Sequence, residues 1–179
     1  MKAIRLIALP ACMAATLDAS AQEQEIRLFS HRGGRMEHDE NTLSAFQASY
    51  DAGYRGFETD IRMTRDGALV ITHDSSLERT TDGTGTVEEK TEAEIRQLAT
   101  KQGNKMMFLD ELLEFLKGKE GLYVEFEMKT KPEALYPEER LHAYCDKLYD
   151  AVMAVKPADA TFVFTSGDYR GLRYLQAKH

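Results

Sequence analysis

The stretch Phe57-Glu58-Thr59-Asp60-Ile61 decides the fold, because it reads as a short strand with two acidic residues at positions i and i+2. Successive side chains on a β-strand point to opposite faces, so Glu58 and Asp60 fall on the same face. Two neighbouring carboxylates raise each other's pKa unless a cation lies between them, and a divalent metal with oxygen ligands is the simplest such cation. Acids at every second position also occur on solvated faces of antiparallel sheets, so this spacing alone leaves a solvated strand and a metal site open.

Segments with strand patterns alternate with segments of helical periodicity along the rest of the chain. The apolar or alternating runs are 25–30, 56–64, 68–72, 122–129 and 161–165. Helical patterns cover 39–53, 91–99, 109–117, 137–155 and 169–177. This alternation favours an α/β fold with parallel strands, and the turn signal Arg65-Asp66-Gly67 predicts one hairpin within it.

Charged residues recur where the predicted strands end, as His31, His73 and Lys129 illustrate. In a (β/α)8 TIM barrel the carboxyl ends of the strands form the active-site face, so this pattern predicts a fold of that type. The chain supplies only four or five strands suited to a barrel, whereas a closed barrel usually takes about 250 residues. We therefore expect a barrel that is truncated after about the fifth strand.

Seven charged residues on or after these strands have complementary chemistry: His31, Arg32, Glu58, Asp60, His73, Glu127 and Lys129. The three acids offer oxygen ligands for Ca2+ or Mg2+, and the two histidines can exchange protons near neutral pH. The arginine and the lysine match the charge of a phosphate group. Each residue taken singly is ordinarily structural or solvated, but the set together favours cleavage of a phosphate ester.

Eight linked motifs then carry a resemblance to the glycerophosphodiester phosphodiesterase family. They are His31-Arg32-Gly33, Glu40-Asn41-Thr42 with Ala45-Phe46, Gly56-x-Glu58-x-Asp60, Thr64-x-Asp66-Gly67, Val70-x-x-His73-Asp74, Leu77-x-Arg79-Thr80-Thr81, Gly83-x-Gly85 and Glu127-x-Lys129. Their order and spacing are similar to the family pattern over residues 28–98, and more loosely to residue 166.

The resemblance implies a phospholipase-C-like (β/α)8 barrel that uses a divalent metal to hydrolyse glycerophosphodiesters to glycerol 3-phosphate and an alcohol. Carried over by position, it implies metal ligands Glu58, Asp60 and Glu127, acid and base His31 and His73, phosphate-binding Arg32 and Lys129, and Glu40 in the same pocket. The choice between Ca2+ and Mg2+, the alcohol head group and the oligomeric state stay open.

The chain departs from the family pattern at two positions near these motifs. Asp39 stands where proline is usual, and Glu125 stands where asparagine is common. The loops of the later barrel strands, which would contact the head group, are also absent.

Two other functions are compatible with this layout. A lipid phosphodiesterase of the sphingomyelinase D type shares the histidines and acid pairs, although the intact motifs Glu40-Asn41-Thr42 and Arg79-Thr80-Thr81 favour the glycerophosphodiesterase. The chain could instead be a non-catalytic fragment that binds metal and phosphate, because an incomplete barrel leaves open sheet edges.

The first residues have the pattern of a secretory signal. Lys2 and Arg5 precede a short apolar run, and Ala19-Ser20-Ala21 fits a cleavage site, so residues 1–21 are expected to be removed and residues 22–179 to form the domain. This predicts export to the periplasm or secretion; the alternative is a lipoprotein anchored through Cys12. The apolar run is too short to span a bilayer, and no transmembrane segment is predicted.

The overall charge argues against a nucleic-acid-binding protein, and the cysteine count argues against a fold that is stabilised by disulfides. A net charge of −7 argues against nucleic acid as a partner, because phosphate backbones require a basic surface. After cleavage the chain keeps one cysteine, Cys145, so no internal disulfide can form, and its apolar surroundings predict a buried thiol.

Overall fold

The structure is a computed structural model that describes residues 28–179. The predicted signal at residues 1–21, with Cys12, lies outside the described residues. The strands are β1 (Phe29–His31), β2 (Gly56–Met63), β3 (Leu69–Ile71), β4 (Tyr123–Met128) and β5 (Thr161–Thr165). The helices are α1 (Leu43–Asp51), α2 (Glu92–Ile95), α3 (Leu109–Leu116), α4 (Glu138–Val155) and α5 (Tyr169–Lys178), with 3-10 turns η1 (Val87–Glu89) and η2 (Glu133–Leu135).

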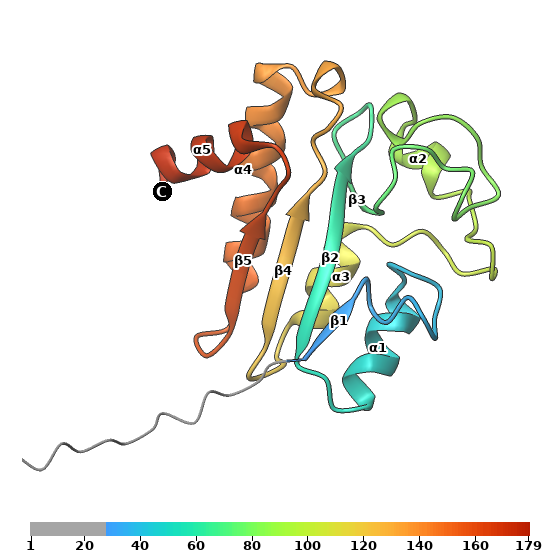
Figure 1. Ribbon diagram of the computed structural model, residues 1–179, viewed down its shortest axis with the longest axis vertical. Coiled ribbons are helices and arrows are strands. Elements are labelled where there is room, and N and C mark those ends of the chain that lie inside the picture. The colour runs from blue at the N-terminus through green and yellow to red at the C-terminus, as the bar shows by residue number, and fades with distance from the viewer. Residues whose placement is uncertain (1–27) are drawn as a thin grey trace, which may run out of the picture.

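Four strands form a parallel sheet in the order β1-β2-β4-β5, and β3 adds an antiparallel hairpin to the end of β2 (Figure 1). The predicted α/β class with parallel strands and the predicted hairpin are therefore confirmed. In the described residues the sheet has five strands, with helices between the parallel ones, as in the first part of a TIM barrel.

The two faces of the sheet differ because side chains alternate along each strand. Phe57 of β2 and Phe126 of β4 are fully buried and belong to one core with Leu112 of α3 and Leu148 of α4. Figure 1 shows α3 and α4 behind the sheet. The acidic residues occupy the alternate positions of the same strands, so the pattern that builds the core also presents carboxylates on the other face.

Helix α1 begins four residues later than its sequence pattern predicts. Thr42 is its N-cap and accepts a hydrogen bond from the backbone N–H of Ala45 (3.3 Å). The preceding Asn41 has a left-handed backbone (φ 58°), which helical geometry does not allow. The burial of α1 does not follow residue polarity throughout, because Leu43 is 45% exposed whereas Ser49 is buried.

The remaining helices agree with the predicted positions, with small differences at their ends. Helix α2 has a capping box, in which Thr91 and Glu94 satisfy each other's backbone N–H groups, but it ends at Ile95, before the predicted end at residue 99. Cys145 is buried in α4, as predicted, and burial raises the pKa of its thiol to about 12. Among residues 28–179, no helix has the length and apolar composition that crossing a bilayer requires.

Candidate active site

Strands β2 and β4 bring three acidic side chains together. Glu58 and Asp60 lie on one face of β2, and Glu127 pairs directly with Asp60 across the β2–β4 ladder. One carboxylate oxygen from each of the three lies within 4.8 Å of the others. The predicted metal-ligand residues therefore meet at the carboxyl ends of neighbouring parallel strands.

The carboxyl group of Glu58 has a strongly shifted pKa. Burial, followed by the negative charge of Asp60, raises its pKa from 4.5 to about 8. Its Oε2 accepts a hydrogen bond from the backbone N–H of Arg32 (3.1 Å), whereas its Oε1 is buried without a hydrogen-bond partner. A buried carboxylate oxygen without a donor is suited to a cation, and three carboxylates are the donor set that Ca2+ and Mg2+ prefer. The residues present therefore fit a divalent metal.

Lys129 supplies a positive charge at this cluster. It follows β4 directly, and its Nζ lies 2.6 Å from Glu127 Oε1 and 3.2 Å from Asp60 Oδ1. The ammonium group bridges two of the three carboxylates, so its charge offsets part of their repulsion. A metal at the same carboxylates would compete with this ammonium group.

Arg32 approaches the cluster from the loop after β1. Its backbone is left-handed (φ 54°), an uncommon conformation that recurs at functional sites. The side chain is buried, with Nε 3.3 Å from Asp60 Oδ2 and Nη1 3.1 Å from Glu40 Oε1. Asn41 donates a further hydrogen bond to Asp60 Oδ2 (2.9 Å), which explains why the chain leaves helical geometry before α1.

Glu40 lies between two arginines. Arg79 binds both of its oxygens, at 2.7 and 3.0 Å, while Arg32 contacts the first of them. Burial raises the pKa of Glu40, but these guanidinium groups more than offset that effect, so its pKa lies below its ordinary value. The geometry favours a carboxylate that orients Arg32.

The two histidines have different surroundings. His31 is half-exposed, with Nε2 3.5 Å from Glu58 Oε2. Burial and then the charges of Arg32 and Arg35 lower its pKa. The other histidine, His73, directs Nδ1 to Asp74 Oδ1 at 2.6 Å.

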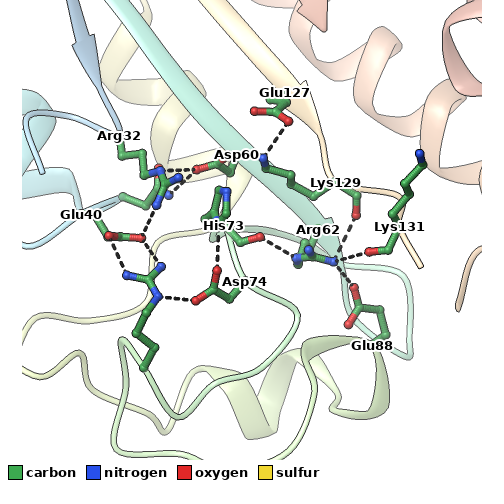
Figure 2. Close-up of polar contacts among 12 residues, drawn as sticks. Arg32, Glu40, Asp60, Arg62, His73, Asp74, Glu88, Glu127, Lys129 and Lys131 are labelled. Carbon is green, nitrogen blue, oxygen red and sulfur yellow. Dashed lines mark hydrogen bonds and ion pairs between the residues drawn. The ribbon is translucent and has the colours of Figure 1, made fainter. Parts of the chain in front are cut away.

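Asp74 is held in place by Arg79, whose Nε donates to its second oxygen. Burial raises the pKa of Asp74, but the hydrogen bonds from Arg79 and His73 outweigh it and bring the pKa to about 2. Asp74 is therefore ionised at neutral pH and fixes the orientation of the His73 ring. Figure 2 shows His73 in contact with Asp74, and Arg32 in contact with Glu40. The hydrogen bonds of Arg79 to Asp74 and Glu40 connect these two pairs.

Every residue of the predicted site contributes to this region, and the structure adds contacts that the sequence did not assign. Asp74 and Arg79 belonged to predicted motifs but had no predicted role. Arg62 and Glu88, which form a buried ion pair of 2.7 Å next to the site, were not singled out at all. Arg62 could have been found from period-two alternation, because it continues the face of Glu58 and Asp60.

The chain matches the Glycerophosphoryl diester phosphodiesterase family over residues 31–179. It is 36% identical over 123 residues to a glycerophosphodiester phosphodiesterase of Caldanaerobacter subterraneus, an alignment that covers 64% of this chain and 50% of the relative. It is 40% identical over 89 residues to human glycerophosphodiester phosphodiesterase 1, covering 50% of this chain and 26% of that protein. The aligned region thus spans half or less of these relatives.

Solved structures give the same result for the fold. The structure superposes on a glycerophosphodiester phosphodiesterase from Agrobacterium tumefaciens with a TM-score of 0.69 and 28% identity, covering 86% of this chain and 63% of that one. It also superposes on an Oleispira antarctica phosphodiesterase in complex with the product sn-glycerol-3-phosphate, with a TM-score of 0.75 and 27% identity, covering 85% and 62%. The predicted relation to barrel enzymes is confirmed.

Proposed function

The chain belongs to the glycerophosphoryl diester phosphodiesterase family, and from this premise we propose that it carries the site for metal-dependent hydrolysis of glycerophosphodiesters to glycerol 3-phosphate and an alcohol. The observation that carries the proposal is the triad of Glu58, Asp60 and Glu127, with Asp60 fully buried and Glu127 partly exposed, bordered by the cations Arg32 and Lys129. The product named for the Oleispira antarctica neighbour supports the substrate class.

The three carboxylates would hold one Ca2+ or Mg2+. When bound, this ion would polarise a phosphoryl oxygen and offset the charge that develops on it. Arg32 and Lys129 would hold the remaining phosphate oxygens, Arg32 with the guanidinium N–H groups that Asp60 and Glu40 do not engage and Lys129 as a point charge. Glu40 would keep the Arg32 guanidinium aimed at the phosphate.

The histidines would exchange the protons. Because its pKa is lowered, His31 would be neutral near pH 7 and suited to accept a proton. His73 would donate its Nδ1 proton to Asp74 in a hydrogen bond, which leaves Nε2 facing the reaction. In its protonated form this ring would act as the acid that protonates the departing alcohol.

Release of glycerol 3-phosphate from glycerophosphocholine tests the proposal. We would measure it with Ca2+, with Mg2+ and with chelator, for the wild-type chain, Glu58→Ala and Glu125→Ala. The control Glu125 lies beside Glu58 in the β2–β4 register but outside the triad. Metal-dependent release that Glu58→Ala abolishes and Glu125→Ala largely retains supports the proposal.

The second candidate is a module that binds metal and phosphate without turnover. It is favoured by the share of each relative that the chain covers, because catalytic groups in TIM barrels come from the ends of several strands. The same assay is therefore run on the chain fused to the remaining barrel segment of a relative. Activity in the fusion alone would assign this chain the binding half of the site, and no activity in either would contradict the hydrolase.

We also propose that the protein is exported. The support is the sequence pattern ending at Ala21. Mass spectrometry of the protein recovered from cells tests this, and we expect a mature chain that begins at Gln22. An acylated chain that begins at Cys12 would support the lipoprotein alternative. Retention of Met1 or Lys2 would contradict export.

A further inference from the structure

Arg62 is a buried arginine on β2 to which the proposed reaction gives no role. It lies two residues beyond Asp60 on the same face of the strand, and its side chain is 8% exposed. An isolated guanidinium at such a position is costly to bury unless its N–H groups are satisfied. The groups that accept hydrogen bonds from Arg62 therefore indicate its role.

The guanidinium of Arg62 binds backbone carbonyls of two separate loops. Nε donates to the carbonyl of His73 (3.0 Å), in the loop after β3. Nη1 donates to the carbonyls of Lys129 (3.2 Å) and Lys131 (3.3 Å), in the loop after β4. Figure 2 shows the guanidinium between these loops.

The two loops lie on opposite edges of β2. Ile61 pairs with Ile71 of β3 on one edge and with Met128 of β4 on the other. The sheet ladder holds each loop to β2 separately, since the Thr72 N–H donates to the carbonyl of Asp60 (2.9 Å) and the Lys129 N–H to the carbonyl of Ile61 (3.0 Å). The Arg62 side chain adds a direct link between the two loops by spanning the end of β2.

Glu88 fixes the guanidinium in this position. Its Oε1 accepts from Arg62 Nη1 at 2.7 Å, and its side chain is 2% exposed. The same carboxylate accepts from Ser75 Oγ (2.6 Å) and from the hydroxyl of Tyr136 (3.1 Å). Glu88 is thus held from three directions, and Ser75 belongs to the same loop as His73.

We propose that Arg62, anchored by Glu88, is a positioning residue that sets the distance between His73 and Lys129. This inference rests on the proposed function, in which His73 moves a proton and Lys129 holds the phosphate. A guanidinium suits the task because its Nε and Nη1 donate from fixed positions in a rigid planar fork, whereas the ammonium group of a lysine is a compact charge on a flexible stem. A shift of the order of 1 Å in either loop would misalign the proton donor and the phosphate, which can reduce turnover about 100-fold.

The test compares Arg62→Gln, Arg62→Lys and Glu88→Gln with the matched control Arg65→Gln. Arg65 lies three residues further along the same hairpin, is 60% exposed, and contacts Glu94 at 3.6 Å, so its change removes the same charge away from the loops. Glu88→Gln keeps a hydrogen-bonding side chain of the same size, so it serves if Arg62→Gln does not fold. Folding is checked by circular dichroism, and kinetics are measured well below the lowest melting temperature.

Turnover gives the first measurement. We expect Arg62→Gln to lower kcat by about 10- to 100-fold, with a smaller change in KM, Arg62→Lys to recover part of the loss, and Arg65→Gln to stay within about twofold of wild type. If Arg62 had a purely structural role, Arg62→Gln would lower the melting temperature, but the folded variant would have the same kcat as Arg65→Gln. An unchanged kcat of this kind would overturn the proposal.

Nuclear magnetic resonance of histidine-labelled chain gives a measurement that does not depend on turnover. The His73 imidazole signal, assigned with His73→Asn, should shift or broaden in Arg62→Gln and Glu88→Gln but not in Arg65→Gln. The signal of His142, which lies on α4 and stacks on Tyr174, should stay fixed. An unchanged His73 signal in both variants would refute the positioning role. If the wild-type chain hydrolyses no substrate, the proposed function is refuted. The His73 signal still tests the positioning role in that case, because it does not depend on turnover.

Discussion

Replacement of Glu58 by glutamine should stabilise the metal-free protein and remove its metal site. Glu58 is 11% exposed on its side chain, and its pKa is raised from 4.5 to about 8, first by burial and then by the charge of Asp60. The folded state therefore binds this proton more tightly than the unfolded state. Stability consequently falls as pH rises through the interval from 4.5 to about 8.

The size of the effect follows from that interval. Between pH 4.5 and pH 7 the unfolded chain has lost the Glu58 proton while the folded chain retains it. At 1.36 kcal/mol per pH unit, the free energy of unfolding at pH 7 is therefore lower by about 3 kcal/mol. This is the largest gain expected, because Asp60 and Glu127 share the repulsion. Glutamine keeps an oxygen that can accept from the backbone N–H of Arg32, so the loss of that hydrogen bond does not offset the gain. For a domain of this size, about 3 kcal/mol corresponds to a melting temperature about 6 to 12 °C higher.

Thermal melts in chelator at pH 5, 7 and 8 measure this. The advantage of Glu58→Gln over wild type should be small at pH 5, grow to pH 8, and be absent in the control Glu125→Gln. Saturating Ca2+ or Mg2+ should raise the melting temperature of wild type and not of Glu58→Gln. A Glu58→Gln chain that melts below wild type in chelator at pH 8 would refute the account of the triad.

Three further changes test other parts of the account. Asp74→Asn should lower the free energy of unfolding by about 2 kcal/mol at pH 7, because hydrogen bonds hold the Asp74 pKa at about 2. In urea unfolding this difference from wild type should disappear as the pH falls through about 2. The variant should also lower kcat about 100-fold, because His73 loses its orientation. Lys129→Met should tighten metal binding in calorimetry, because the ammonium group competes with the metal for two of the carboxylates. It should also raise KM. Weaker metal binding in this variant would contradict the proposed competition. Phe126→Ala should cost about 3 to 5 kcal/mol in urea unfolding, since the ring is fully buried between sheet and helices, and a loss under 1 kcal/mol would show that the core relaxes around it.

The order of the elements could be predicted from the sequence because periodicity reports which face of a segment is buried. All five strands in the described residues were predicted, and the alternation around Glu58 and Asp60 correctly placed both acids on one face. The periodic pattern alone places the start of α1 at residue 39, four residues before the observed start at Leu43. Asn41 takes a left-handed backbone to reach Asp60, and that long-range hydrogen bond overrides the local helical pattern.

Site residues that lie on strands could be predicted from their spacing. Contacts between residues of separate loops could not, because only the folded chain brings those loops together. The triad follows from spacing on two strands. Burial of Ser49 in place of Leu43 depends on hydrogen bonds to Ser30 Oγ and the carbonyl of Gly33, which no periodicity encodes. The ion pair of Arg62 with Glu88 joins residues 26 positions apart, and only the folded chain brings them together.

Calorimetric titration of Ca2+ and Mg2+ into the metal-free chain at pH 7 tests the central claim most directly, namely that Glu58, Asp60 and Glu127 hold one divalent metal. Repeated in two buffers of different ionisation enthalpy, it also counts protons. We expect one ion per chain and release of about one proton, because the raised pKa keeps Glu58 protonated at pH 7 until the metal binds. Both signals should vanish in Glu58→Gln and persist in Glu125→Gln. Binding of equal affinity in Glu58→Gln, or no binding to wild type, would contradict the claim.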